Sequence, residues 1–274
     1  MLETTVYCGY RIMVITPVFQ TGDRGSIPLT RSYNFMASKK QEGVAIEKIL
    51  KNLGLKPSIS EEHGLSLIGP EDESIFSPGI STGGFAEIRM AKQNPKRKII
   101  ATTIDKEGLD FAQKIIANLN LSNQIETRFE DLREPENYQP GSFDFIYARL
   151  VLHYLSFQDL NKVLKDFYKI LKENGKLFVV VRSTRNIPNR DDITFDQKTQ
   201  ITSIPRYDSD GNISHIERRY FHTLESIGGH LEGAGFTINK KREYQEQLYK
   251  DFARKEPAPK MDHVIEVCAS KSPL

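Results

Sequence analysis

From residue 73 onward, short apolar runs alternate with amphipathic stretches along the chain. The runs have the length and the β-branched or alternating character of strands. They cover residues 73–78, 98–105, 124–131, the beginning of 142–155, and 176–183. The stretches carry apolar residues at helical spacing, and they cover residues 85–93, 107–121 and 159–172. Strand and helix in alternation predict an α/β fold with a doubly wound, mostly parallel sheet and helices on both faces.

The pattern changes after Arg182, where a long polar segment, 184–222, interrupts the alternation. Within it, two stretches of period two flank the turn residues 208–212, which predicts a hairpin that covers the ligand site as a lid. A helix over 225–236 and strands over 236–244 and 263–270 follow. We therefore expect a seven-stranded sheet with a lid insertion after the fifth strand.

Residues before 73 are harder to assign to the fold. The stretch 44–55 predicts an amphipathic helix, and 58–73 is interpreted as a polar connector. The expected divisions are an N-terminal extension over 1–35, a helical cap over 36–72 and the main domain over 73–274. The stretch from Arg24 to Leu29 can be encoded by nucleotides that pair like a transfer-RNA T-arm. One hypothesis is therefore that 1–35 is a translated upstream gene and that the protein starts at Met36; the other is a genuine disordered or substrate-capping N-terminus.

Composition narrows the class of partner. A net charge of +2 gives no electrostatic footprint for nucleic acid or an anionic membrane. The longest apolar runs are too short to span a bilayer. Two cysteines, Cys8 and Cys268, form no disulfide framework and fit a reducing compartment. We expect a cytoplasmic monomer or homodimer without a nucleic-acid or membrane partner.

Chemistry-bearing residues follow the first three strands. The loop IFSPGISTGG (75–84) contains Gly79, Gly83 and Gly84, which allow the backbone to approach a ligand closely. Asp105 ends the second strand, where an acid binds ribose hydroxyls, and Asp131 ends the third, where an acid accepts from an adenine amino group. Ligands bind at this edge of a doubly wound sheet. These residues together predict an adenosine-type site.

Longer stretches resemble the class I S-adenosylmethionine-dependent methyltransferases that act on small molecules. The matching segments are GISTG (79–83), TIDKEGLDFAQ (103–113), RFEDLRE (128–134), the long stretch from Ser142 to Val180 and LEGAGF (231–236). The resemblance implies the Rossmann-like methyltransferase fold and S-adenosylmethionine as cofactor. It also implies the cofactor-binding residues Gly79, Ser81 and Gly83 for the methionine part, Asp105 for the ribose, Asp131 and Leu132 for the adenine, and Arg149 beneath the sulfonium.

The first motif departs from the family's pattern. Ser77 stands where the family has an acid, and Ser81 stands where it has the middle glycine. In the family that acid orders the amides of the loop. A hydroxyl accepts one hydrogen bond without the strength of a charge, so the departure bears on cofactor affinity.

Residues for the acceptor side are less specific. His153 and His222 are candidates for a catalytic base, which is needed only if the acceptor carries a proton of high pKa. His153 alternatively packs or caps the strand end. Tyr154 and Arg182 are expected to line the substrate pocket. The arginines of the insertion either recognise an acidic substrate or form a solvated strand face, and they are Arg185, Arg190, Arg206, Arg218 and Arg219. No metal site is expected, because the sequence DSDGN lacks the glycine position and the final Glu of a calcium loop.

Two further interpretations stay open. A short-chain NAD(P)-dependent dehydrogenase would use Ser156, Tyr168 and Lys172, although Tyr168 follows the glycine loop too closely for that family. A methyltransferase-like fold that binds a ligand or partner without catalysis is the other, motivated by Ser77 and Ser81. Nucleic-acid methylation is not expected, because the fourth strand ends in YARLV without the motifs of base methyltransferases.

Overall fold

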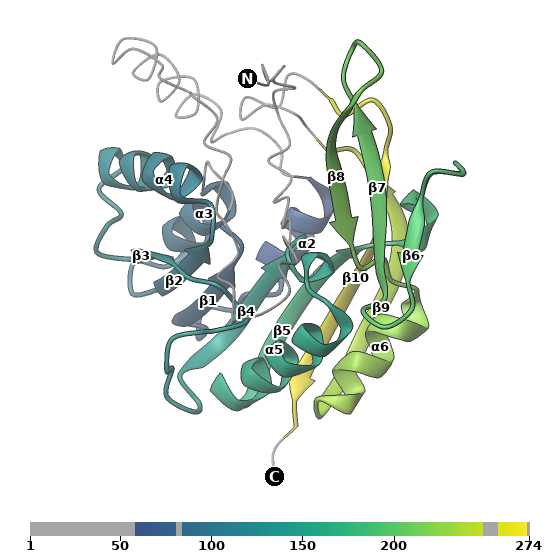
Figure 1. Ribbon diagram of the computed structural model, residues 1–274. Coiled ribbons are helices and arrows are strands. Elements are labelled where there is room, and N and C mark those ends of the chain that lie inside the picture. The colour runs from purple at the N-terminus through teal and green to yellow at the C-terminus, as the bar shows by residue number, and fades with distance from the viewer. Residues whose placement is uncertain (1–57, 81–83, 249–256, 273–274) are drawn as a thin grey trace.

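A large twisted sheet forms the centre of the molecule (Figure 1). The computed structural model describes residues 58–80, 84–248 and 257–272. Within these ranges seven strands pair in the order β3-β2-β1-β4-β5-β10-β9. Their bounds are β1 Ser74–Pro78, β2 Lys98–Thr103, β3 Ile125–Phe129, β4 Phe143–Arg149, β5 Leu171–Arg182, β9 Phe236–Glu246 and β10 Asp262–Lys271. The strands β1 to β5 pair in parallel, and β10 runs antiparallel to both of its neighbours. The predicted doubly wound, mostly parallel sheet is confirmed.

Helices cover both faces of this sheet. On one face lie α2 (Ile59–Ser66), α3 (Phe85–Gln93) and α4 (Lys106–Asn118), which pack with Phe145 and Tyr147 of β4 in one buried cluster. On the other lie α5 (Phe157–Ile170) and α6 (Leu224–Gly233), which pack with Ile146 and Ala148. Successive side chains of a strand point to opposite faces. The central residues of β4, 145–148, are therefore apolar and buried, because both faces of the strand are covered.

One element contradicts the sequence interpretation. Residues 58–73 were expected to be a polar connector, but they contain helix α2. The buried side of this helix consists largely of small or polar residues, including Ser60, Glu61 and Gly64, so no apolar stripe announces it. A side chain at Gly64 would collide with the rings of Tyr147 and Phe178. The predicted helix 44–55 and the extension 1–35 lie outside the described residues.

The insertion after β5 forms a second sheet. It consists of β6 (Thr194–Asp196), β7 (Ile201–Tyr207) and β8 (Ile213–Arg219), paired antiparallel in that order, and we call it the small sheet. The predicted hairpin is confirmed by the pairing of β7 with β8. The backbone N–H of Tyr220, just after β8, donates to the carbonyl of His153 over 2.8 Å. This bond ties the end of the small sheet to the segment that follows β4.

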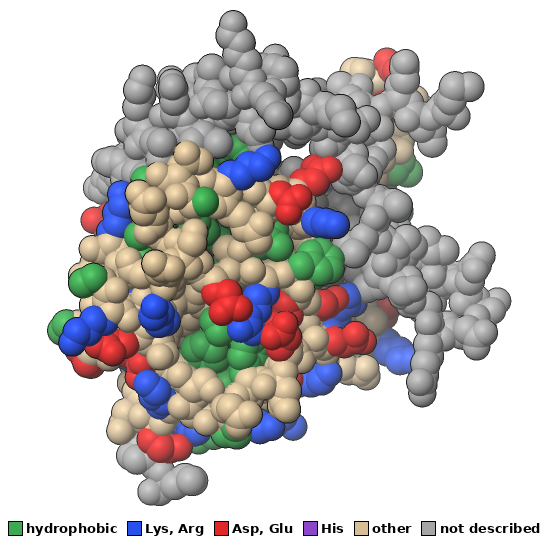
Figure 2. All heavy atoms as spheres, turned by 90° about the vertical axis from the view of Figure 1, so that its left-hand side faces the viewer, with side chains coloured by type: hydrophobic (Ala, Val, Ile, Leu, Met, Phe, Trp, Pro, Cys, Tyr) green, Lys and Arg blue, Asp and Glu red, His purple; other side chains and the backbone are tan. Residues whose placement is uncertain are grey.

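The face beyond β3 is seen in Figure 2, where basic and acidic side chains are interspersed around a patch of hydrophobic ones. Charges of both signs next to each other give this face no strong field of a single sign. In the described ranges, none of the helices combines the length and the apolar character that crossing a membrane requires.

Candidate functional site

Loops at the carboxyl ends of β1 to β4 surround a pocket, which we call the edge pocket. Its lining residues are Gly79, Thr102, Thr103, Ile104, Glu130, Asp131, Leu132, Arg133, Val151, Tyr154 and Leu155. Gly79 adopts a φ of 81°, and its N–H donates to the carbonyl of Thr102 over 2.7 Å. A Cβ at this position would lie 2.8 Å from Val151. Only glycine combines this backbone conformation with so close an approach.

Asp105 directly follows the pocket residues at the end of β2. Its Oδ1 accepts a hydrogen bond from the N–H of Gly108 over 3.1 Å, so that it caps the N-terminus of α4. The cap holds the carboxylate at the N-terminus of α4, next in the chain to Ile104, which lines the pocket. The position fits the ribose-binding role that the resemblance implies for Asp105.

Two acids follow β3 with different surroundings. Both carboxylate oxygens of Asp131 bond the side chain of Arg133. Burial works to raise the pKa of Asp131, but the hydrogen bonds and charge of Arg133 outweigh burial and place the pKa below its ordinary value. Glu130 is 6% exposed, and its Oε2 accepts from the hydroxyl of Tyr138 over 2.6 Å. Burial raises the pKa of Glu130, whose Oε1 has no hydrogen-bond partner among the described residues.

Glu130 was missed in the sequence. Glu130 and Asp131 are neighbours in the sequence. Only the alternation of side chains along the extended chain decides which of the two acids is buried. The edge pocket therefore contains two carboxyl groups after β3, one paired with Arg133 and one buried with an oxygen that has no partner among the described residues. An amino group such as that of adenine is a suitable donor to either of them.

Arg149, at the end of β4, turns away from the edge pocket. Its Nε donates to Ser60 Oγ over 2.7 Å, and its Nη2 donates to Ser58 Oγ over 2.6 Å. Nη2 also lies 3.5 Å from Glu246 Oε2. The side chain thus sits against α2, whereas Val151, Tyr154 and Leu155 provide the β4 side of the pocket.

Two histidines lie on the other side of the loop after β4. His153 belongs to the short 3-10 helix η1 (Leu152–Tyr154), is 1% exposed, and has no hydrogen-bond partner for either ring nitrogen within the described ranges. Burial, together with the charges of Arg219 and Arg182, holds its pKa well below the ordinary value. Burial, and to a lesser degree His230, lowers the pKa of His222 to about 3. Both imidazoles are therefore neutral near pH 7.

Buried ion pairs surround these histidines. Arg219 of β8 is 1% exposed and pairs with Glu217, and Arg182 at the end of β5 pairs with Asp262. The guanidinium of Arg219 lies 5.1 Å from the ring centre of Tyr154. Tyr154 also lines the edge pocket. We call His153, His222, Arg182, Arg219, Glu217 and Asp262 the small-sheet cluster, and Tyr154 connects it to the edge pocket.

The other arginines of the insertion differ in their surroundings. Arg206 is half-exposed and donates to Glu217 over 2.6 Å. Arg185 and Arg190 are paired nearer the surface, with Glu243 and Asp192 respectively. Among these five, Arg219 is buried as a whole, and the partly exposed Arg218 also buries its Nη1.

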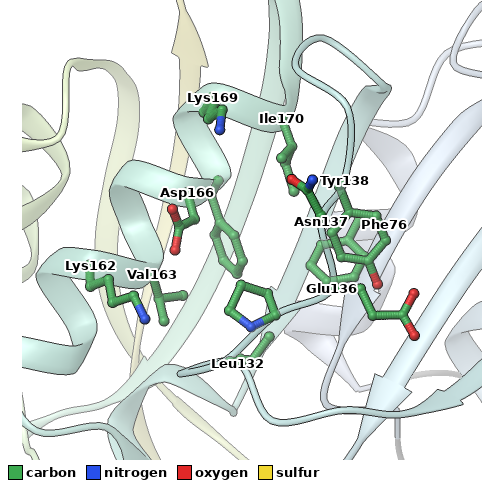
Figure 3. A pocket seen from close by; sticks show the side chains of 12 residues that line it. Phe76, Leu132, Glu136, Asn137, Tyr138, Lys162, Val163, Asp166, Lys169 and Ile170 are labelled. Atoms are coloured by element: carbon green, nitrogen blue, oxygen red, sulfur yellow. The ribbon is translucent and has the colours of Figure 1, made fainter.

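A larger pocket, of about 230 Å³, lies between α5 and the connection from β3 to β4 (Figure 3). We call it the outer pocket. Figure 3 shows Phe76 and Tyr138 beside the chain of the connection, with Lys162, Asp166 and Lys169 along α5 opposite. The space exists because no helix follows β3 in the described chain. Of the predicted site residues the structure describes, only Leu132 reaches it, so the edge pocket remains the candidate site.

Other predicted positions need only brief mention. Ser81 and Gly83 lie outside the described residues. Within the described part of the chain, no group of three or more His, Cys, Asp or Glu side chains gathers in a way that would hold a metal ion.

Comparisons with known proteins agree with this geometry. Residues 77–179 match the family model described as a methyltransferase domain. A demethylmenaquinone methyltransferase of Lactobacillus johnsonii is 30% identical over 106 residues, which are 38% of this chain and 42% of that protein. The chain therefore matches about two fifths of the length of this curated relative. The chain carries a class I S-adenosylmethionine-dependent methyltransferase domain.

Solved structures share the fold of this methyltransferase domain. A methyltransferase from Methanosarcina mazei is 15% identical, with a TM-score of 0.57, over 76% of this chain and 95% of that chain. The cyclase SpnF is 13% identical, with a TM-score of 0.51, over 98% of this chain and 88% of that chain. At such identities the likeness concerns the fold. S-adenosylmethionine is the cofactor of the methyltransferase domain. The binding of its adenosine part by Asp105 and Asp131, and of its methionine part by Gly79, stays a prediction.

The dehydrogenase interpretation finds no support in the geometry. Lys172 Nζ pairs with Asp144 Oδ1 over 2.7 Å, near the start of β4. Tyr168 packs against Phe236 at the start of β9. Both residues thus lie at the amino ends of the strands, whereas the edge pocket lies at their carboxyl ends.

Proposed function

We propose that the protein transfers the methyl group of S-adenosylmethionine to a small-molecule acceptor bound between the edge pocket and the small sheet. The observation that carries the proposal is the environment of His153. Residues on both sides of it, Val151 and Tyr154, line the edge pocket, while its own ring is buried towards Arg219 and Arg182. Burial of an imidazole without hydrogen-bond partners reduces the stability of the fold. A polar group of a bound acceptor would supply the missing hydrogen bond.

The cofactor would supply a methyl group on a positively charged sulfur, and the protein's main task is alignment. Well-aligned groups can gain about 7–11 kcal/mol over free reactants. The buried His153 is neutral, so one ring nitrogen can accept a hydrogen bond from an O–H or N–H of the acceptor. Arg219 and Arg182 disfavour its protonated form. His153 is therefore suited to orient the acceptor rather than to retain its proton.

The small sheet would close the acceptor side of this site. Tyr154 contacts the edge pocket with its ring and lies beneath the guanidinium of Arg219. His222, which follows the small sheet, bridges in parallel to Ser183 just after β5. These contacts support a lid role for 184–222, with Tyr154 and Arg182 as pocket residues. They also favour an uncharged acceptor, since Arg219 and Arg182, whose charges act on His153, already pair with Glu217 and Asp262.

The test is a screen with S-adenosylmethionine that carries a trideuterated methyl group. The protein is incubated with fractionated small-molecule extracts, and mass spectrometry looks for products heavier by one trideuterated methyl. A His153→Ala variant should bind S-adenosylhomocysteine like the wild type but form the product much more slowly. Methylation of protein or nucleic acid alone would contradict the small-molecule acceptor.

A second candidate is ligand or partner binding without methyl transfer. It is favoured by Ser77 at the end of β1 and by the sharing of this fold with a protein described as a cyclase. This candidate predicts binding of S-adenosylmethionine without turnover in any extract. Release of S-adenosylhomocysteine that depends on an acceptor decides against it.

A further inference from the structure

A second group of buried charges lies behind the first loop, on the face covered by α2 and α3. Glu61, Glu87 and Glu246 are 3%, 3% and 1% exposed, and each acts electrostatically on Tyr147, as does Arg149. We call these five residues the carboxyl cluster. Three carboxyl groups thus share the electrostatic surroundings of a single guanidinium.

Glu246 is well satisfied within this cluster. Its Oε1 accepts from the N–H of Ser60 over 2.6 Å, and its Oε2 accepts from Ser60 Oγ over 2.8 Å. Arg149 lies 3.5 Å from the same Oε2. The burial of Glu246 is therefore explained by the attachment of α2 to the end of β9.

Glu87 differs from Glu246. Its Oε1 accepts from Ser77 Oγ over 2.6 Å, and its Oε2 is buried without a hydrogen-bond partner in the described part of the chain. The hydroxyl of Tyr147 is likewise buried without one. Burial is the main reason that the pKa of Glu87 lies above its ordinary value. A buried carboxyl group whose second oxygen has no partner destabilises the fold unless a ligand completes it.

The position of Glu87 indicates which group of a ligand would bond its second oxygen. It lies in the first turn of α3, three residues after Gly84, and reaches back to Ser77 at the end of β1. Gly79, two residues beyond Ser77, forms the β1 wall of the edge pocket. The edge pocket takes the adenosine part over β2 and β3. The opposite end of the same cofactor, an amino acid with a charged α-ammonium group, then lies towards β1 and its neighbour β4.

We propose that Glu87, held by Ser77, binds the α-ammonium group of the cofactor and supplies the negative charge that Ser77 lacks. Glu87 is thus a cofactor-binding residue outside every motif in the sequence. The inference rests on S-adenosylmethionine as the cofactor in the proposed function, but not on any acceptor or on turnover.

The test compares two ligands. S-adenosylhomocysteine carries the α-ammonium group, whereas 5′-methylthioadenosine contains the nucleoside and sulfur without the amino acid. Binding of each is measured by calorimetry to the wild type and to Glu87→Gln. Gln keeps an acceptor for Ser77, and its neutrality suits a buried position, so the melting temperature should not fall.

We expect Glu87→Gln to weaken S-adenosylhomocysteine binding about tenfold or more, since a hydrogen bond to a charged group is worth about 1.5–3 kcal/mol. Binding of 5′-methylthioadenosine should change less than about twofold. The double variant Ser77→Asp with Glu87→Gln returns a carboxylate to the same place and should recover most of the lost affinity. Glu225→Gln, at an exposed position in the first turn of α6, is the matched control.

Unchanged S-adenosylhomocysteine affinity in Glu87→Gln overturns the inference. Equal weakening of both ligands overturns it as well, because Glu87 would then act only on the shape of the loop. If the wild type itself binds neither S-adenosylhomocysteine nor S-adenosylmethionine, the proposed function fails first and this inference fails with it.

Discussion

The edge pocket and the small-sheet cluster lie on two sides of the same segment after β4, yet they are built in different ways. The edge pocket consists of residues at or just after the carboxyl ends of β1, β2, β3 and β4, with bonds between neighbouring strand ends such as that from the N–H of Gly79 to the carbonyl of Thr102. The small-sheet cluster is held by ion pairs between distant elements, such as Arg182 of β5 with Asp262 of β10. Substitution of pocket residues that face a ligand should therefore cost little stability. Substitution within the small-sheet cluster should change both the stability of the fold and the site beside it.

Arg219→Met should give the largest effect on stability. It leaves Glu217, which is 2% exposed, with the half-exposed Arg206 as its one remaining ion-pair partner among the described residues. Loss of one member of a buried pair costs about 3–5 kcal/mol, and we expect about 3 kcal/mol because Arg206 remains. Urea unfolding measures it.

The matched variant for this test is Arg219→Met with Glu217→Gln, which removes both charges and should recover most of the loss. Binding of 5′-methylthioadenosine to the single variant should stay within about threefold of the wild type. A loss of nucleoside binding as large as the loss of stability would show that the two regions are not separable.

Asp105→Ala should weaken S-adenosylhomocysteine binding by about tenfold to several hundredfold, since hydrogen bonds to a carboxylate contribute about 1.5–3 kcal/mol each. It also removes the cap of α4, at about 1 kcal/mol. Asp105→Asn keeps a good capping residue and separates the two effects: stability is restored but affinity is not. Calorimetry and thermal unfolding measure both, with Asp110→Ala, exposed on the same helix, as control. Equal affinity of wild type and Asp105→Ala would place the ribose elsewhere.

The buried histidines make stability depend on pH. The pKa of His222 is about 3 in the folded protein against an ordinary value of 6.5, so between these values the unfolded chain binds a proton that the folded chain does not. This group therefore leaves the free energy of unfolding at its full value above about pH 6.5. As the pH falls below 6.5, the free energy of unfolding decreases by up to about 1.4 kcal/mol per pH unit for one group. His222→Gln should flatten the slope between pH 6 and 4 in urea titrations. An identical slope in both proteins would mean that His222 is accessible to protons when folded.

Tyr154→Leu should give the smallest effect, but on both regions at once. The ring lines the edge pocket and lies beneath Arg219. Loss of the cation–π contact should cost about 1 kcal/mol of stability, and S-adenosylhomocysteine binding should weaken a few-fold. Tyr154→Phe keeps the ring and is the control. A change in only one of the two measurements would show that Tyr154 does not connect the regions.

The sheet and the order of its elements followed from the sequence pattern alone, and the same pattern gave the prediction of an adenosine-type site. Those features depend on periodicity and on residues that immediately follow a strand, such as Gly79, Asp105 and Asp131, where position in the chain fixes position in space. The family's motifs covered the same stretch. The hairpin of the small sheet could also be read from its period-two pattern around the turn 208–212.

Only the tertiary structure decided the rest. The sequence pattern did not predict helix α2, because the buried side of this helix includes Ser60, Glu61 and Gly64 rather than an apolar stripe. The direction of Arg149, the inward turn of Glu130 and the pairing of Arg219 with Glu217 depend on which face of an element is covered. Glu87 and Ser77 are ten positions apart and meet only because α3 folds back over the end of β1. The pKa and the binding partners of a carboxyl group depend on its burial and on its neighbours in space, and the order of the residues alone does not give either of them.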